Sequence, residues 1–384
     1  IWGLAVKLPR WWAMGLMAAV SPILAHGFEL GRPDHQSLLV LLIAVALAAE
    51  VGIWSRWSAA WGYVSAAAWG LALWVSLFEP AVILVAVVSA RLLARSGRLD
   101  LGPAALFAAI LLGAFLIDGW RAAAFPQAFD RWALNIGELR SAGFGVIFAW
   151  CGWLVAAAAV ILAWRAARGA GRICGLFTGL LVLLGALCFW HSRWGYFLAI
   201  VFAISLPWSL AAFRWRWLAV LILLTSLWPV AEEWEEMLYP KGEAFQSRIE
   251  KMADAVALRE AALAIQNLPE GGVLAPWWFS PAIVWWSGQP CIGGSSHQSL
   301  PGIVDSCRFY LATEDATARE ILRQRKVEYV FAYEPDRVVS NSGQILGEKS
   351  NGGTLAERLY KNSPPPWLEP VFRNRFFRVY RVGD

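Results

Sequence analysis

The sequence predicts a polytopic α-helical membrane protein with a C-terminal mixed α/β domain, and three observations support this fold class. Hydrophobic residues make up 58% of the 384 positions and charged residues only 16%, whereas soluble proteins carry about 25% charged residues. Up to residue 231 the chain is a series of apolar stretches of roughly 20 residues, the length that crosses a bilayer. From residue 232 onward the composition becomes polar and charged. Together these features exclude a purely soluble enzyme and an intrinsically disordered chain.

About nine apolar stretches in the first part of the chain are expected to form membrane-spanning helices. They are residues 11–28, 37–54, 57–78, 81–96, 102–118, 143–164, 174–190, 194–212 and 215–231. The stretches 81–96 and 102–118 are close to the lower length limit of a span. The chain also contains 25 Trp residues, and indole rings favour membrane–water interfaces. The Trp content therefore agrees with a chain that crosses this interface many times.

The arginines of the connecting segments indicate which side of the membrane each loop occupies. Cytoplasmic loops retain positive charge, and alternate connections carry Arg91, Arg95, Arg98, Arg165, Arg168, Arg172, Arg214 and Arg216. The intervening loops 29–36 and 119–142, and the region after residue 231, are less basic. We therefore expect a transmembrane helical domain over 1–231 with outside loops 29–36 and 119–142, and an extracytoplasmic α/β domain over 232–384.

The C-terminal region alternates helical and strand-like patterns, which is typical of a small α/β domain. We expect helices over 232–266, 316–326 and 353–362, strands over 273–276, 282–288 and 327–333, and a long strand or strand pair over 372–382. A region of about 150 residues is large enough to hold its own core. Cys291 and Cys307 could pair if this region is exported, although the sequence does not fix their separation.

The outside loop 29–36 contains an acidic residue beside a histidine, Asp34 and His35. Carboxylate oxygen suits Mg²⁺ or Mn²⁺, so Asp34 is a candidate metal ligand. The alternative is that Asp34 caps the helix that follows it. The spacing alone favours the cap.

The outside loop 119–142 is long for a connection between packed helices, and long ordered loops are often functional. Its first half fits an amphipathic helix in the headgroup layer, anchored by aromatic side chains. The run Asn135–Glu138 fits that interpretation less well, because Asn and Gly interrupt the pattern. Glu138 is therefore a candidate site residue.

An arginine and a pair of tryptophans complete the candidate residues. Arg193 is expected at the outer end of a span, where a guanidinium can bind a lipid phosphate by forked hydrogen bonds or can simply extend to the interface. Trp277 and Trp278 stand between prolines and form either a binding wall for a peptide or sugar, or part of a packed core. The sequence contains no CxxC pair, HExxH motif or Walker-type loop.

Taken together, four segments resemble, in order, the catalytic-subunit family of oligosaccharyltransferases, membrane glycosyltransferases of the GT-C class. GRPDHQSL is similar to the second outside loop of that family, and NIGE to the TIXE/SVSE motif of its long catalytic loop. SRWGYFLAIVFAISL is similar to the span whose Arg contacts the lipid-linked donor. VLAPWWFSPAIVWWSGQPCIGG is similar to the WWDYG region. The resemblance covers about residues 30–310 and implies a GT-C-like fold.

The resemblance also implies a role for each candidate residue. Asp34 and Glu138 would be the catalytic carboxylates and the ligands of a divalent metal, Mg²⁺ or Mn²⁺. Arg193 would bind the phosphate of a polyprenyl-linked donor, with His35 close to it. Trp277 and Trp278 would line the acceptor site.

Three departures from the family pattern bear on the expected function. Phe279 stands where the family has an Asp that reads the acceptor sequon. The family's first catalytic Asp would precede residue 1, so a missing N-terminal segment is expected. Fewer spans separate Asp34 from Glu138 than in the family. These differences suggest a divergent bacterial member, multi-pass in the inner membrane, whose acceptor is not a standard Asn-x-Ser/Thr sequon.

The expected function is therefore a metal-assisted transfer of a glycan from a polyprenyl-(pyro)phosphate donor to a protein or other acceptor on the outer face. Membrane lipid is an expected partner and nucleic acid is not. One alternative is a metal-independent polysaccharide ligase or polymerase that uses lipid-linked donors. Another is a non-catalytic membrane transport or binding protein. Transporters place ionisable residues near the bilayer midplane, whereas these spans are almost free of charge, with Glu50 near one end as an exception.

Overall fold

The computed structural model describes residues 10–27, 35–55, 58–94, 100–119, 128–169, 171–296, 299–349, 352–361 and 363–383. The chain forms two compact units. The first, here the helical unit, comprises Ile1–Ala122 and Glu138–Pro240. The second, here the sheet unit, comprises Ala123–Gly137 and Lys241–Asp384. Each unit is described by itself.

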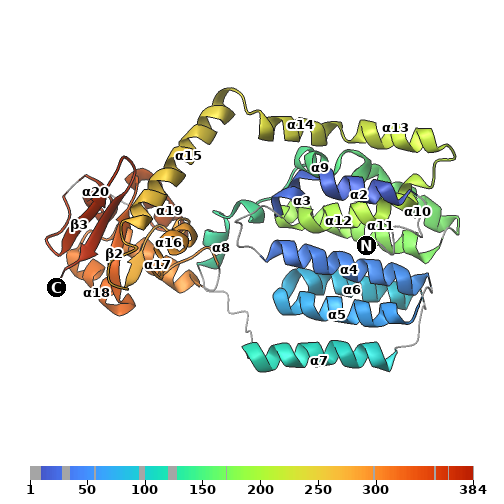
Figure 1. Ribbon diagram of the computed structural model, residues 1–384, viewed down its shortest axis with the longest axis horizontal. Coiled ribbons are helices and arrows are strands. Elements are labelled where there is room, and N and C mark those ends of the chain that lie inside the picture. Colours follow the sequence, from blue (N-terminus) through green and yellow to red (C-terminus); the bar gives the residue numbers. More distant parts are fainter. Residues whose placement is uncertain are drawn as a thin grey trace. The chain divides into compact units, whose positions relative to one another are not determined.

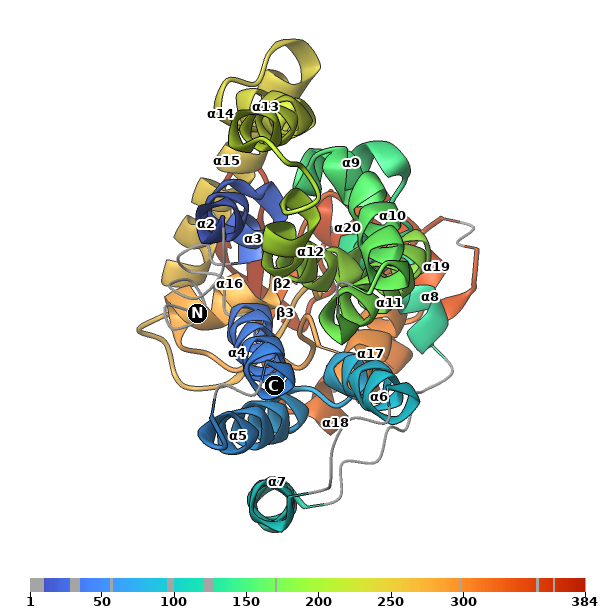
Figure 2. The same ribbon diagram turned by 90° about the vertical axis from the view of Figure 1, so that its right-hand side faces the viewer.

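The helical unit consists of helices whose long axes lie roughly side by side (Figures 1 and 2). They are α2 (Trp11–Val20), α3 (Pro22–Gly27), α4 (Gln36–Trp54), α5 (Ala60–Val75), α6 (Phe78–Leu93), α7 (Leu101–Asp118), α9 (Phe144–Cys151), α10 (Leu154–Ala167), α11 (Arg172–Trp190), α12 (Gly195–Leu210), α13 (Arg216–Ser226) and α14 (Trp228–Leu238), with the 3₁₀ turns η1 (Gly137–Leu139) and η2 (Ser192–Trp194).

Helix α12 is the centre of the helical unit. Almost every side chain along it is buried, and it packs against α2, α4, α10 and α11. A helix that is apolar on all sides is expected in such a central position. In contrast, α7 buries none of its residues inside the unit, so its apolar surface is free to face lipid.

Within the described part of the chain, five helical segments are long and apolar enough to cross a membrane. They are Gln36–Trp54, Leu101–Asp118, Arg172–Trp190, Ser192–Leu210 and Arg216–Leu238. The pair α9 and α10 would add a sixth if it is one broken span. These helices indicate a membrane protein; the larger number of nine spans and their orientation stay predictions.

The expected continuous helix over 143–164 is broken. Helices α9 and α10 meet at an angle of 82°, and Gly152 between them has φ +73° and ψ 163°, a conformation that is open almost only to glycine. A Cβ at this position would collide with the backbone oxygen of Ser226. Glycine therefore allows both the bend and the close approach of the α13–α14 junction.

The sheet unit has α helices around a small mixed sheet. Its elements are α8 (Phe129–Ala133), α15 (Gly242–Leu263), β1 (Gly272–Leu274), α16 (Ser280–Ser287), α17 (Leu300–Leu311), α18 (Asp315–Arg325), β2 (Val327–Ala332), α19 (Pro335–Leu346), α20 (Leu355–Tyr360), β3 (Leu368–Arg373) and β4 (Arg378–Val382). The strand order is β1-β2-β4-β3. β1 is parallel to β2, whereas the β2–β4 and β3–β4 pairs are antiparallel. A mixed C-terminal sheet is thus confirmed, and the 372–382 region belongs to a strand pair.

One strand prediction in this unit is wrong. Residues 282–287 lie in α16, which begins at Ser280 with Pro281 in its first turn and ends before Gly288. The fixed φ of proline suits a helix start. Ile283 and Ser287, one turn apart, are buried, and the Ser287 hydroxyl donates to the Ile283 carbonyl at 2.6 Å. The β-branched and aromatic composition suggested a strand, but the buried face has helical spacing.

Cys291 and Cys307 are free thiols. Burial raises the pKa of each thiol from its usual value to about 12. Cys291 also lies 3.7 Å from the Ser280 carbonyl oxygen, to which its thiol donates. Cys307 therefore acts as a small buried group of the core, and the half-buried Cys291 packs against the core.

Candidate functional site

Arg193 lies in a buried polar cluster of the helical unit. Its Nε is 2.7 Å from Oε1 of Glu79, and the two side chains are 26% and 5% exposed. Glu79 is in the first turn of α6, and its second oxygen accepts a hydrogen bond from the Ser76 hydroxyl at 2.5 Å. The carboxylate is therefore compensated on both oxygens, as a buried charge requires.

Two side chains at the start of α4 contact the same guanidinium. Nη2 of Arg193 lies 3.1 Å from Nε2 of His35. Since a guanidinium only donates, this contact is a hydrogen bond in the tautomer whose Nε2 carries no proton. The buried Gln36 amide, oriented with its oxygen toward Arg193, accepts from Nε and Nη2 at 2.6 Å each.

The local sequence holds Arg193 at the junction of two helices. α11 ends at Trp190, η2 makes a single turn, and α12 begins at Gly195. Trp194 is 2% exposed and packs its ring 5.8 Å from Phe78 and 5.9 Å from Phe197. The buried Trp anchors the turn on both sides, so the neighbouring Arg193 points away from that core.

Glu138 is on a segment that is hydrogen-bonded to the same turn. The Ser192 hydroxyl donates to the Glu138 backbone oxygen at 3.1 Å, and the Ser192 N–H donates to the Arg140 carbonyl at 2.6 Å. His191 Nδ1 lies 2.6 Å from the Leu139 carbonyl oxygen. The buried Tyr196 directs its hydroxyl toward the Glu138 carboxylate at 3.4 Å. Residues 138–140 therefore run beside residues 191–196.

The structure brings Arg193 and His35 into direct contact and places Glu138 on the adjoining segment. Asp34 lies outside the described residues. Sequence reasoning missed Glu79, Gln36 and Tyr196 as members of this cluster. Glu79 had one available signal, because it is an acidic residue between the expected spans 57–78 and 81–96, and a buried arginine needs a counter-ion.

The described residues do not form a metal site on their own. In the ranges that the structure covers, no group of three or more His, Cys, Asp or Glu side chains is gathered as metal ligands require. Glu138 is the one described member of the expected ligand pair.

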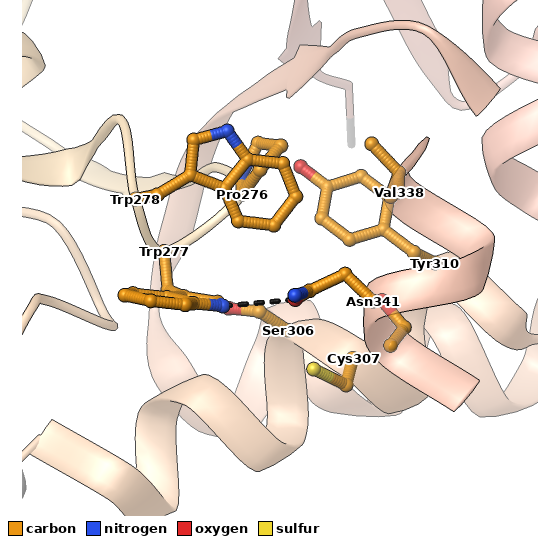
Figure 3. A pocket seen from close by; sticks show the side chains of 9 residues that line it. Pro276, Trp277, Trp278, Ser306, Cys307, Tyr310, Val338 and Asn341 are labelled. Atoms are coloured by element: carbon orange, nitrogen blue, oxygen red, sulfur yellow. Dashed lines mark hydrogen bonds between the residues drawn. The ribbon is translucent and has the colours of Figure 1, made fainter. Parts of the chain in front are cut away.

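Trp277 is part of the interior of the sheet unit. Its side chain is 7% exposed, its ring lies 5.9 Å from that of Trp132, and its Nε1 donates to Oδ1 of Asn341 at 2.9 Å (Figure 3). The adjacent cavity measures about 10 Å³, which holds roughly one water molecule. In this conformation the cavity has no room for a sugar or a peptide side chain.

Trp278 and Phe279 differ in their surroundings. Trp278 lies across this cavity from Tyr310 (Figure 3), with the Arg337 guanidinium 5.4 Å from its ring centroid. Phe279 instead packs edge-on to the rings of Tyr333 and Phe377, at 4.9 Å and 5.1 Å. The Phe279 side chain is thus part of the core and does not line the cavity.

A second buried ion pair lies at the other end of α4. The Glu50 carboxylate, 2% exposed, is 2.5 Å from Nη2 of Arg91 and accepts from the Ser65 hydroxyl at 2.6 Å. One Glu50 oxygen thus accepts a hydrogen bond, and the other forms a close ion pair. The pair joins α4, α5 and α6, and its role is structural.

No protein-family model matches this sequence. A search of curated proteins finds no significant match. Solved structures do share its fold. The archaeal oligosaccharyltransferase AglB from Archaeoglobus fulgidus, in complex with an inhibitory peptide and a dolichol-phosphate, has a TM-score of 0.58 at 13% identity over 90% of this chain and 57% of that one.

Two further structures of the Archaeoglobus fulgidus oligosaccharyltransferase agree. One is tethered to an acceptor peptide containing the NVT sequon (TM-score 0.55, 14% identity, 98% of this chain and 58% of that one). The other is a complex with Zn and sulfate (TM-score 0.53, 14% identity, 97% of this chain and 57% of that one). At such identities the likeness is one of fold, and this chain spans about 57–58% of the length of these proteins. The fold is oligosaccharyltransferase-like.

Proposed function

We propose that this chain is a membrane glycosyltransferase that moves a glycan from a polyprenyl-(pyro)phosphate donor to a protein or other acceptor. The observation that carries the proposal is the setting of Arg193. Its guanidinium stands at the start of a buried helix and is oriented by three side chains, yet is 26% exposed. The oligosaccharyltransferase-like fold supports the proposal, because one neighbour of this fold was solved with a dolichol-phosphate.

In the proposed reaction, a nitrogen or oxygen of the acceptor attacks the anomeric carbon of the donor sugar and gives up its proton to a carboxylate of the site. The bond from that carbon to the phosphate oxygen breaks, and the polyprenyl (pyro)phosphate leaves with the electron pair. Arg193 donates hydrogen bonds to the leaving phosphate, on which negative charge grows. Such donors are most effective when they are oriented in advance and shielded from water. His35 is proposed to stand near the same phosphate.

We propose Glu138 and Asp34 as the catalytic carboxylates of this site and as ligands of a divalent cation, Mg²⁺ or Mn²⁺. When bound, the cation would supply positive charge for the leaving phosphate. The Tyr196 hydroxyl, 3.4 Å from the Glu138 carboxylate, supports a fixed orientation of that side chain. An assay with and without a chelator separates this proposal from a metal-independent polysaccharide ligase or polymerase.

The acceptor is proposed to bind at the Trp277–Trp278 pair, against the half-buried ring of Trp278, with the buried Trp277 ring supporting Trp278 from inside the unit at 5.8 Å. A neighbour of the same fold was solved with an acceptor peptide, which supports a peptide as one acceptor class. The inward packing of Phe279 leaves its position without a polar group for an acceptor hydroxyl. The acceptor is therefore proposed to differ from an Asn-x-Ser/Thr peptide.

The proposed location is a bacterial inner membrane, with loops 29–36 and 119–142 and the region 232–384 on the extracytoplasmic side. This orientation follows from the arginine distribution. Labelling of single cysteines in intact cells by a membrane-impermeant maleimide tests it. Reaction at positions in 232–384 and protection at position 168 are expected, and the reverse pattern would overturn the orientation.

The function is tested with the full-length protein in lipid vesicles and a fluorescent polyprenyl-linked glycan. Transfer by the wild-type chain should be lost in Arg193→Ala and Glu138→Gln and on addition of EDTA, and Mg²⁺ or Mn²⁺ should restore it. Arg323→Ala is the matched control, because this arginine is 79% exposed and, among the residues that the structure describes, pairs with Glu320 on the same helix. If the Arg193→Ala variant still transfers the glycan at the wild-type rate, the proposal is wrong.

A further inference from the structure

We infer that Glu79 is a positioning residue that sets the orientation of Arg193 toward the donor phosphate. The inference rests on the proposed function of Arg193 and adds a residue that neither the sequence motifs nor the fold comparison identified. Its basis is a polar cluster in which described residues engage one edge of the Arg193 guanidinium, formed by Nε and Nη2.

The contacts to Arg193 all fall on one edge of its guanidinium. Glu79 contacts Nε, His35 contacts Nη2, and Gln36 contacts both nitrogens. None of the described residues accepts a hydrogen bond from Nη1. The planar group has five N–H donors in a fixed fork, so holding one edge determines where the two hydrogens of Nη1 point.

Among the three side chains that contact Arg193, Glu79 is the carboxylate, and its own position is fixed. It is 5% exposed, and Ser76 at the end of α5 donates to its second oxygen at 2.5 Å. A buried carboxylate that lost Arg193 would be left uncompensated, which is strongly unfavourable. Glu79 therefore stays paired when an anion approaches, and the guanidinium bridges the buried carboxylate and the incoming phosphate.

The elements that meet at this point make the arrangement rigid. Glu79 belongs to α6, Ser76 caps α5, His35 and Gln36 start α4, and Arg193 links α11 to α12. α6 packs on α11, and α4 packs on α12. The orientation of Arg193 thus depends on the packing of helices that are distant in sequence, with Glu79 as the link to α6.

The test uses the full chain in nanodiscs and measures kcat and KM for the lipid-linked donor, binding of a fluorescent short-chain polyprenyl phosphate, and thermal unfolding. Glu79→Ala should lower kcat/KM about 10- to 100-fold, because small misplacements of a catalytic group have such effects. Glu79→Gln, which keeps an oxygen for Nε, should recover most of this loss. In an Arg193→Ala background, Glu79→Ala should add almost nothing.

Two further variants keep the inference testable if Glu79→Ala folds poorly. Ser76→Ala removes the hydroxyl that holds the Glu79 carboxylate and should lower kcat/KM in the same direction, again only when Arg193 is present. Glu50→Ala is the matched control, since it removes a buried ion pair about 20 Å away along α4. It should lower thermal stability and leave the donor KM unchanged.

The other possible results contradict either the inference about Glu79 or the proposed function. Additive losses in the Glu79 and Arg193 double variant would mean that Glu79 acts elsewhere, and the inference would be wrong. Tighter binding of the polyprenyl phosphate by Glu79→Ala would mean that Glu79 competes with the donor, which also contradicts it. If Arg193→Ala itself leaves donor binding and transfer unchanged, the proposed function fails. If only Glu79→Ala is silent, this inference alone fails.

Discussion

The carboxylate of Glu79 lies 2.7 Å from Nε of Arg193, and this ion pair connects the first turn of α6 to the turn between α11 and α12. The pair is buried on the Glu79 side and partly open on the Arg193 side. The pair therefore has two properties. It links α6 to α11 and α12, and it leaves the Arg193 guanidinium partly exposed.

The first prediction concerns the stability of this pair. Arg193→Ala leaves the 5% exposed Glu79 carboxylate without its counter-ion, so the free energy of unfolding should fall by about 3 kcal/mol. The double variant with Glu79→Ala should recover part of that loss, because the unpaired charge is then absent. Thermal unfolding in detergent measures both. A double variant less stable than Arg193→Ala would contradict the argument.

The second prediction compares the stability cost of removing the buried Trp277 ring with that of removing the exposed Trp285 ring. Trp277→Ala removes a 7% exposed ring and its hydrogen bond to Asn341, so it should cost about 3–5 kcal/mol of stability. Trp285, 79% exposed, is the control, and its replacement by Ala should change stability by less than about 0.5 kcal/mol. Equal effects at the two positions, measured by thermal unfolding, would show that Trp277 is not a core residue.

The third prediction concerns the bend between α9 and α10. Gly152→Ala forces a Cβ into a backbone conformation of φ +73° and ψ 163° and against the Ser226 carbonyl, and should cost about 1–3 kcal/mol. Gly113→Ala in α7, where a Cβ meets nothing within 4 Å, should be neutral or stabilising by up to about 1 kcal/mol. Melting temperatures of the two variants provide the comparison. A tolerated Gly152→Ala would mean that the bend is relaxed in the membrane.

The fourth prediction is a pH dependence of the sheet unit. Burial raises the pKa of the Cys291 and Cys307 thiols from 9.0 to about 12. As the pH rises above 9, these thiols ionise in the unfolded chain but stay neutral in the folded one. Stability from the two thiols is thus present below pH 9 and is lost as the pH rises toward 12.

Alkylation by iodoacetamide followed by mass spectrometry checks this prediction. At pH 8 both thiols should react slowly in the native protein and rapidly after denaturation, since the thiolate is the reactive form. Cys291→Ser and Cys307→Ser should each flatten the loss of stability between pH 9 and 12. Rapid native alkylation at pH 8 would show that the thiols are accessible and ionised.

Much of the fold could be predicted from the sequence because its signals are local. Each expected apolar stretch contains helical residues, and the strands expected over 273–276 and 327–333 overlap β1 and β2. The strand or strand pair expected over 372–382 includes β4 and only the last two residues of β3, which begins at Leu368. The failures have physical causes. Residues 282–288 combine strand-forming residue types with helical spacing, and the bend at Gly152 depends on the distant carbonyl of Ser226.

The candidate site could be predicted only in part, for a related reason. Arg193 and His35 were both identified as site residues, and they meet although 158 positions separate them. Glu79 and Gln36 carry no motif of their own, and their roles arise from the packing of α4 and α6 around the η2 turn. Tyr196 is one turn of chain beyond Arg193, but only the course of residues 138–140 brings its hydroxyl to Glu138. Such relationships are set by tertiary structure, which local patterns do not encode.

The hydrogen bonds between residues 138–142 and 188–192 limit where insertions and deletions can be accepted in this chain. The Ser192 N–H is bonded to the Arg140 carbonyl, and the Ala142 N–H to the Cys188 carbonyl. Inserting or deleting one residue in either segment would shift this register and carry Glu138 away from Arg193. Insertions within 138–142 or 188–192 are thus expected to be tolerated less readily than insertions in the connection between α10 and α11, which lies outside this pairing.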